Sequence, residues 1–198
     1  MARSASAETE VKRSRFVADV VRVDDEDAAR SVIEEVRRRH HDARHHCTAF
    51  VIGPDAALRR SNDDGEPAGT AGAPMLEMLT RRGISDVVAV VTRWFGGTLL
   101  GAGGLVRAYG DAVGLALDEA GVRERALRHT MQVRASAADA GALDNRLRSL
   151  GVVTDVAYRD EVVFAVSVVD PDRFTSELAG ISAGAATAEC TGTSWVDL

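Results

Sequence analysis

Cysteine, lysine and long apolar runs are scarce in this sequence, and each scarcity excludes a class of protein. Its two cysteines, Cys47 and Cys190, are too few and too far apart to form a disulfide framework. The longest apolar stretches, around residues 87–91 and 162–169, have the length of a strand and cannot span a bilayer. The first residues also lack the apolar core that a signal peptide needs. We therefore expect a cytoplasmic protein with no membrane association.

The charge of the chain limits its partners. Lys12 is the only lysine, so arginine supplies nearly all of the positive charge, and the formal net charge is −6. Nucleic-acid-binding proteins usually carry a basic excess, so DNA is not an expected partner, and RNA binding requires a local cationic face. A chain of 198 residues fits two domains. We place a flexible segment at residues 1–11, a first domain at 12–126 and a second at 127–198.

Hydrophobic periodicity predicts a mixed first domain. A valine-rich run predicts a strand, a continuous apolar run predicts a central one, and amphipathic repeats predict helices. Thr70 is the expected N-cap of the middle helix, and Gly121 is the expected cap at the end of the last. The patterns predict strands at residues 15–23, 47–53, 58–61 and 87–92, and helices around residues 28–36, 75–79 and 105–120.

The rest of the chain predicts a separate α+β unit. Its elements follow in the order β-α-β-β-α-β, which is the ferredoxin-like arrangement. The fold class is therefore α+β, with a β-α-β first domain and a ferredoxin-like second domain. The patterns predict strands at residues 128–135, 152–158, 162–169 and 187–196, and helices at residues 138–150 and 171–182.

A glycine-rich segment at residues 93–104 is the first candidate site. A buried strand leads into it and a helix follows it, so its backbone N–H groups and the helix dipole are suited to an anion. Arg93 and Arg107 flank the segment and could bind phosphate. The Rossmann and Walker glycine patterns do not fit, so we expect no nucleotide cofactor. The alternative is that the glycines only permit a tight turn and close packing. The glycines concerned are Gly96, Gly97, Gly101, Gly103 and Gly104.

Three carboxylates in a turn-rich loop form the second candidate. Asp63, Asp64 and Glu66 surround Gly65, and such a cluster is compatible with a metal site or with general acid–base chemistry. Their spacing is not that of a calcium-binding loop, and we expect no bound metal. The alternative is turn formation and helix capping around Gly65 and Thr70.

Two further patterns have simpler interpretations. His45, His46 and Cys47, with a histidine pair at residues 40–41, could suggest zinc or a cysteine nucleophile. No second ligand pair lies nearby, so we expect packing and a polar contact beside the two loops. Residues 180–184 match the GxSxG motif of hydrolases, but they lie at the end of a predicted helix and no histidine follows them. We interpret that match as chance.

Four stretches of the first domain, residues 12–16, 43–47, 63–74 and 91–110, form a set of motifs in a fixed order. These stretches resemble the IMPACT/YigZ family of small cytoplasmic proteins. The resemblance implies a first domain similar to domain IV of elongation factor G and a second similar to the ferredoxin-like final domain of that factor. It also implies a link to translation, and the bacterial members resemble RNA or ribosome binders by analogy of fold.

We therefore expect a non-enzymatic protein that is linked to the regulation of translation and contacts RNA or the ribosome. Trp94 and Phe95 would stack on bases where they are exposed. One alternative is a hydrolase that uses Asp63, Asp64 and Glu66, with or without a metal, and another is a protein-interaction adaptor. The expected binding residues are Arg15, His45, His46, Asp63, Asp64, Gly65, Glu66, Thr70, Gly72, Arg93, Gly96, Gly97, Gly101, Gly103, Gly104 and Arg107.

Overall fold

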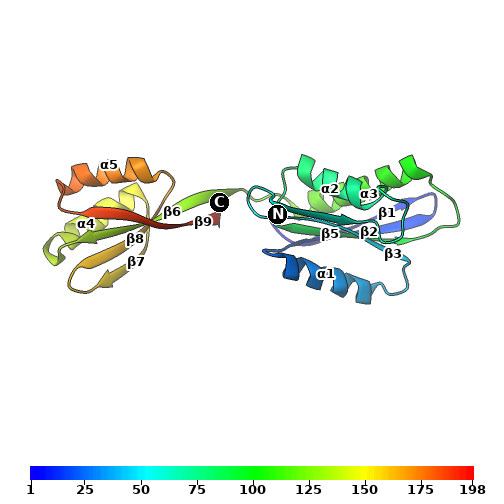
Figure 1. The fold of residues 1–198 in the computed structure, drawn as a ribbon, viewed down its shortest axis with the longest axis horizontal. Helices are drawn as coiled ribbons and strands as arrows, with labels where there is room; N and C mark the ends of the chain where they lie inside the picture. Colours follow the sequence, from blue (N-terminus) through cyan, green and yellow to red (C-terminus); the bar gives the residue numbers. More distant parts are fainter. The chain divides into compact units, whose positions relative to one another are not determined.

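The computed structural model describes residues 1–198, and the chain divides into two compact units, Met1–Arg123 and Glu124–Leu198 (Figure 1). The division after residue 126 that we expected from sequence falls inside the first strand of the second unit, Arg125–Ala135. None of the helices combines the length and the apolar composition needed to cross a membrane.

The first unit is built on a five-stranded antiparallel sheet with the order β1-β2-β5-β3-β4. The central strand β5 is apolar over most of its length because helices cover both faces of the sheet (Figure 1). The edges of the sheet are β1 and β4. The strands are β1 (Ala5–Val11), β2 (Ser14–Arg22), β3 (His45–Ile52), β4 (Leu58–Asn62) and β5 (Val87–Trp94).

Three helices pack on this sheet. Helix α1 (Glu26–Arg39) covers one face, where its buried Val36 joins Phe50 and Val88 in a small core. Helices α2 (Gly72–Arg81) and α3 (Ala102–Ala120) cover the other face and enclose the larger core. The Asp25 carboxylate caps α1 by accepting a hydrogen bond from Ala28 N. The sheet with helices on both faces positions the loops at one end of β5.

The expectation of a flexible segment at residues 1–11 is wrong for residues 5–11. These residues form β1, which pairs with β2 along its whole length. Alternate side chains of β1, including Ala5, Ala7 and Val11, pack on the larger core. The Lys12–Arg13 turn that joins the two strands has positive φ angles of 47° and 64° without a glycine. A turn of this kind lacks the usual Asn-Gly sequence signal, so local patterns do not predict the hairpin.

The second unit confirms the ferredoxin-like expectation. Its four strands form an antiparallel sheet with the order β7-β8-β6-β9, so the first and third strands of the unit are neighbours. Alternate residues of β8, from Val162 to Val168, are buried against the helices. The elements are β6 (Arg125–Ala135), α4 (Ala137–Leu150), β7 (Val152–Tyr158), β8 (Val162–Val168), α5 (Pro171–Ser182) and β9 (Thr187–Asp197).

Candidate functional site

The two loops singled out by sequence meet at the buried carboxylate of Glu66. Its Oε1 atom accepts hydrogen bonds from Arg93 Nη1 at 2.6 Å and from Tyr109 Oη at 2.7 Å. Arg93 lies near the end of β5, Tyr109 lies on α3, and Glu66 lies in the loop before α2. The acidic loop and the glycine-rich segment are therefore held together by one buried group.

The expectation that Arg93 acts as an exposed phosphate ligand is wrong. The Arg93 side chain is 7% exposed and the Glu66 side chain 4% exposed. Arg93 Nη2 also lies 3.4 Å from Ser14 Oγ, to which it donates. A buried guanidinium paired with a carboxylate contributes to the positioning of β5 and the acidic loop and is not available to an anion in solvent. Sequence reasoning missed Ser14 and the polar role of Tyr109, which lies within the helix predicted around residues 105–120.

Asp63 caps helix α2 from a position well upstream of the helix. Its carboxylate accepts hydrogen bonds from the backbone N–H groups of Gly69, Ala71 and Gly72, at 2.8, 3.0 and 2.8 Å. Burial acts to raise the pKa of Asp63, but these three hydrogen bonds outweigh it and lower the pKa below its usual range. Thr70 is not the N-cap, since its Oγ1 donates to the Pro67 carbonyl oxygen. Asp63 performs the role expected of Thr70.

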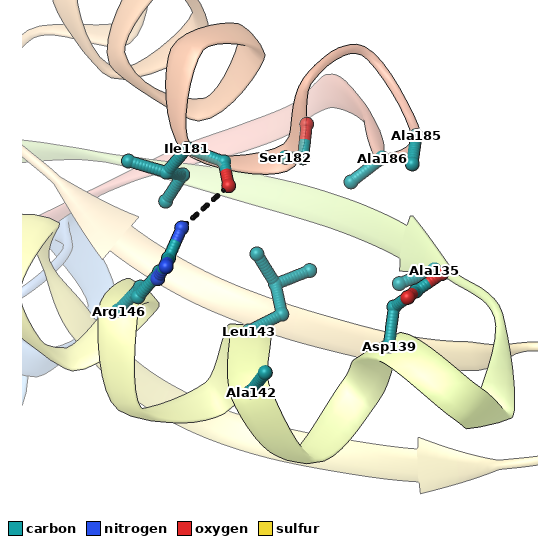
Figure 2. Close-up of a pocket in the computed structure, with 9 residues that line it drawn as sticks. All are labelled: Ala135, Asp139, Ala142, Leu143, Arg146, Ile181, Ser182, Ala185 and Ala186. Carbon is teal, nitrogen blue, oxygen red and sulfur yellow. Dashed lines mark hydrogen bonds between the residues drawn. The ribbon is translucent and has the colours of Figure 1, made fainter.

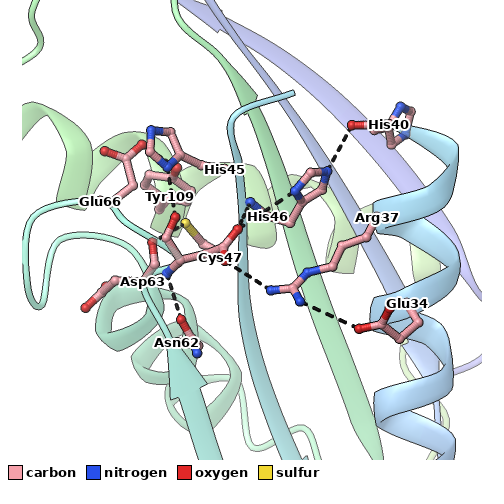
Figure 3. A network of polar contacts seen from close by, with 11 residues as sticks. Glu34, Arg37, His40, His45, His46, Cys47, Asn62, Asp63, Glu66 and Tyr109 are labelled. Atoms are coloured by element: carbon pink, nitrogen blue, oxygen red, sulfur yellow. Dashed lines mark hydrogen bonds and ion pairs between the residues drawn. The ribbon is translucent and has the colours of Figure 1, made fainter. Parts of the chain in front are cut away.

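Asp64 connects the acidic loop to β3 and to α1, and Figure 3 shows its partners Arg37 and His46. Its Oδ2 atom accepts a hydrogen bond from the backbone N–H of His46 at 2.7 Å, and its Oδ1 atom accepts one from Arg37 Nη2 at 3.0 Å. His45 Nδ1 lies 2.9 Å from the Asp64 carbonyl oxygen, and His46 Nε2 lies 3.0 Å from the His40 carbonyl oxygen. Both histidines thus contact the backbone of neighbouring segments. Arg37 is a member of this network that sequence reasoning did not identify.

Cys47 and Tyr109 lie in the interior of the same network. Cys47 Sγ donates to the Asp63 carbonyl oxygen at 3.0 Å. Burial raises the pKa of the Cys47 thiol to about 12, so the thiol stays protonated at neutral pH. Burial also raises the pKa of Tyr109 well above its usual range. No group of three or more His, Cys, Asp and Glu side chains is arranged to hold a metal ion.

The glycine-rich segment packs against the turn between β1 and β2. A Cβ atom on Gly96 would lie 2.0 Å from the backbone carbon of Arg13, so only glycine fits at that position. Gly96 N donates to Ser14 Oγ at 3.2 Å, and Arg13 Nη2 donates to Thr98 Oγ1 at 3.0 Å. This contact brings the basic turn beside the segment. Helix α3 begins at Ala102, earlier than expected, so Gly101 is its N-cap and Gly103 and Gly104 lie in its first turn.

Four exposed basic side chains border the glycine-rich segment, and we call them the cationic rim. The turn supplies Lys12 and Arg13, β2 supplies Arg15 and α3 supplies Arg107. Arg15 also pairs with Glu8 and lies over the Trp94 ring at 4.6 Å. Lys12 and Arg13 were not among the expected site residues, although they belong to the first stretch that resembles the family.

Two aromatic side chains lie at the end of β5 beside the cationic rim. Phe95 is 49% exposed. Trp94 is partly buried, and its Nε1–H donates to Asp42 Oδ2 at 2.9 Å. This hydrogen bond lowers the pKa of Asp42. Each ring has a guanidinium over it, Arg15 at 4.6 Å over Trp94 and Arg93 at 5.6 Å over Phe95. Phe95 is the more exposed of the two rings.

The second unit contains a separate small pocket between α4 and the end of α5 (Figure 2). Its volume is about 160 Å³, and its lining is mostly apolar. Leu143 points into it, and Arg146 Nη1 donates to the Ile181 carbonyl oxygen at 2.7 Å. The guanidinium is thus used to cap the end of α5. Residues 180–184 lie at this helix end, as the sequence suggested, and form no hydrolase elbow.

The fold and the site together define a class: a two-unit α+β protein in which loops at one end of an antiparallel sheet are joined by a buried polar network and bordered by basic side chains. The model of the Impact N-terminal domain matches residues 12–117, which includes every element of this site. The chain belongs to the IMPACT family.

The matches to its relatives cover either most of the chain or about half of it. The chain is 42% identical to the IMPACT family member YvyE of Bacillus subtilis strain 168, over 82% of this chain and 75% of the relative. It is 52% identical to the IMPACT family member YigZ of Escherichia coli strain K12, over 54% of each chain. A solved structure described as a hypothetical protein is 36% identical, with a TM-score of 0.64 over 96% of this chain and 95% of the other. The similarity to that structure therefore extends across both units.

Proposed function

We propose that this chain is a non-enzymatic, cytoplasmic protein that takes part in the regulation of translation by binding single-stranded RNA at the cationic rim. The observation that carries the proposal is the gathering of Lys12, Arg13, Arg15 and Arg107 around the glycine-rich segment, in a chain whose net charge is −6. An acidic protein that concentrates exposed basic groups at one place has the local cationic face that RNA binding requires. The link to translation rests on membership of the IMPACT family.

The geometry supports backbone contacts to RNA. Gly97 is exposed, Arg13 is held beside Thr98, and α3 starts at the same segment with its N-terminal N–H groups. Phosphate oxygens accept hydrogen bonds from N–H groups and guanidinium groups in such a setting. Phe95, being half exposed, offers an aromatic face on which a base stacks. Stacking is possible where bases are unpaired, so the proposal specifies single-stranded RNA.

The same geometry gives less support to a hydrolase. Each of the three acidic-loop carboxylates already has structural partners: Asp63 caps α2, Asp64 binds His46 N and Arg37, and Glu66 binds Arg93 and Tyr109. A general acid or base needs a carboxylate that reaches the substrate. These carboxylates hold the loop in place, so we propose that they support the RNA-binding surface without contacting RNA.

The test is a salt titration with a fluorescein-labelled single-stranded RNA of about 20 nucleotides. Arg13→Ala/Arg15→Ala should bind about tenfold more weakly at low salt, and the slope of log affinity against log salt should fall by roughly 0.7 for each phosphate that the variant no longer binds. Fluorescence anisotropy measures both quantities. The proposal would be contradicted if the wild-type protein did not bind the RNA, or if the double variant bound it with equal affinity.

A matched control removes two exposed arginines elsewhere on the first unit. Arg38 lies on α1 and Arg81 at the end of α2, and both are exposed. The Arg38→Ala/Arg81→Ala variant has the same net charge as the test variant. It should bind RNA with the affinity of the wild-type protein. An equal loss of affinity in both variants would show that overall charge, and not the cationic rim, determines binding.

A further inference from the structure

A groove runs along the outer edge of the first unit, between β1 and α3. Its volume is about 460 Å³. One of its walls is β1, an edge strand whose backbone groups on one side have no partner strand. The other wall is the flank of α3. A groove between an edge strand and a helix is the setting in which extended peptides add to a sheet as a further strand.

The groove has a charged end and an apolar end. Lys12 and Arg107 lie at the end near the start of α3, and Leu115 lies two turns further along that helix. Leu115 is 46% exposed, which leaves an apolar contact open to a partner. The single acid that lines the groove is Asp111, and neither Lys12 nor Arg107, both of which are exposed, forms an ion pair with it. The charged end is therefore complementary to an acidic group.

The hydroxyl group of Thr9, which lines the groove, is a further feature that points to a ligand. Its Oγ1 atom is buried and has no hydrogen-bond partner, although buried hydroxyl groups are nearly always paired. Rotation of the Thr9 side chain toward the groove would allow this hydroxyl to form a hydrogen bond with a backbone group of a peptide lying beside β1. Thr9 also lies on the same face of β1 as Val11, so one ligand would contact both.

From these features we infer that the groove binds an extended protein segment as a sixth strand of the sheet, with an acidic side chain or terminus at Lys12 and Arg107 and an apolar side chain toward Leu115. A second copy of this chain fits less well. Antiparallel pairing of two β1 strands would bring Glu8 and Glu10 of both copies onto one face, where like charges destabilise a sheet. The inference goes beyond RNA binding and does not depend on it.

The inference is tested by selection from a displayed library of degenerate octapeptides. The wild-type protein should enrich peptides in which an acidic residue is separated by an even number of positions from an apolar residue, because alternate residues of a strand share a face. Lys12→Glu/Arg107→Glu and Leu115→Asp should bind the enriched peptide at least about fivefold more weakly. No enrichment, or equal binding by these variants, would overturn the inference.

Matched controls keep the charge change but move it away from the groove. Arg38→Glu/Arg81→Glu reverses two exposed arginines, and Val122→Asp replaces an apolar residue that is 68% exposed. Both should retain wild-type affinity for the enriched peptide, and a decrease equal to that of the groove variants would overturn the inference.

Hydrogen exchange provides a second measurement that uses the wild-type protein and therefore does not depend on the folding of any variant. Adding the enriched peptide to the wild-type protein should slow exchange of β1 amides and leave those of the opposite edge strand, β4, unchanged. If Lys12→Glu/Arg107→Glu weakened RNA binding while its affinity for the peptide stayed the same, these two residues would belong to the nucleic-acid surface and not to a peptide groove. Failure of RNA binding alone, with β1 protection intact, would count only against the proposed function.

Discussion

The acidic loop and the glycine-rich segment lie side by side, yet their side chains are used in opposite ways. The carboxylates of Asp63, Asp64 and Glu66 are groups that are common in active sites, but each one accepts hydrogen bonds from the protein itself. The glycine-rich segment has few side chains with polar groups, but it presents Gly97, Phe95 and the neighbouring Arg13 to solvent. The carboxylates therefore build the scaffold here, and a glycine, an aromatic ring and an arginine form the surface.

The largest expected effect comes from separating the buried pair. Arg93→Ala should lower the free energy of unfolding by about 3 to 5 kcal/mol, because it leaves the Glu66 carboxylate buried without its charged partner. Urea unfolding followed by circular dichroism measures the change. Arg82→Ala breaks the exposed pair with Asp118 and should cost less than about 1 kcal/mol. Similar costs for the two variants would contradict the assignment of Glu66 to the scaffold.

Substitution of Gly96 should have the next largest effect. Gly96→Ala forces a Cβ atom against the backbone of Arg13, which cannot move away as a flexible side chain would. We expect a decrease of about 2 to 3 kcal/mol in the free energy of unfolding, measured by the same urea titration.

Gly103 provides the control within the same segment. It lies in the first turn of α3, and a Cβ atom there would have no neighbour within 4 Å. Gly103→Ala should therefore be neutral or stabilising by up to about 1 kcal/mol. Equal destabilisation by the two alanines would show that the close contact with Arg13 does not set the requirement for glycine.

Removal of the Asp63 cap should have a moderate, pH-dependent effect. Asp63→Ala should cost about 1 to 2 kcal/mol at neutral pH, as for other helix caps. Since the folded protein lowers the pKa of Asp63 below the ordinary value of 3.8, its contribution is present above that value and is lost as the pH falls through the folded-state pKa. The difference in unfolding free energy between the wild type and Asp63→Asn should therefore shrink below about pH 4. A difference that does not change with pH would contradict the capping role.

The smallest expected effect concerns the chemical labelling of the two cysteines, Cys47 and Cys190. At neutral pH, a thiol reagent such as Ellman's reagent should react with exposed Cys190 and leave Cys47 unmodified, because Cys47 is buried and its thiol is protonated. Cys190→Ser should therefore abolish fast labelling of the native protein. Labelling of both cysteines in urea serves as the control, and fast native labelling of Cys190→Ser would contradict the buried position of Cys47.

Local patterns in the sequence predicted most elements but not their long-range partners. The central strand β5 and the long helix α3 follow from continuous and periodic apolar residues. The cap of α2 could not be found in this way, because Asp63 reaches Gly72 through the fold of the loop and not through a local capping motif. Arg93 follows the apolar run of β5, and nothing in that local pattern predicts its burial, which depends on Glu66 from a different loop. Pairings of this kind depend on tertiary structure that local periodicity does not encode.

The two ends of the first unit lie next to each other. Ala2 N donates to the Gly121 carbonyl oxygen and Arg3 N donates to the Ala120 carbonyl oxygen, so the start of β1 and the end of α3 are adjacent. A short linker could join these two points without moving either element, which is the requirement for circular permutation. New ends opened in the exposed turn near Pro54 and Asp55, far along the chain from the glycine-rich segment, would then give a rearranged unit with an unchanged cationic rim.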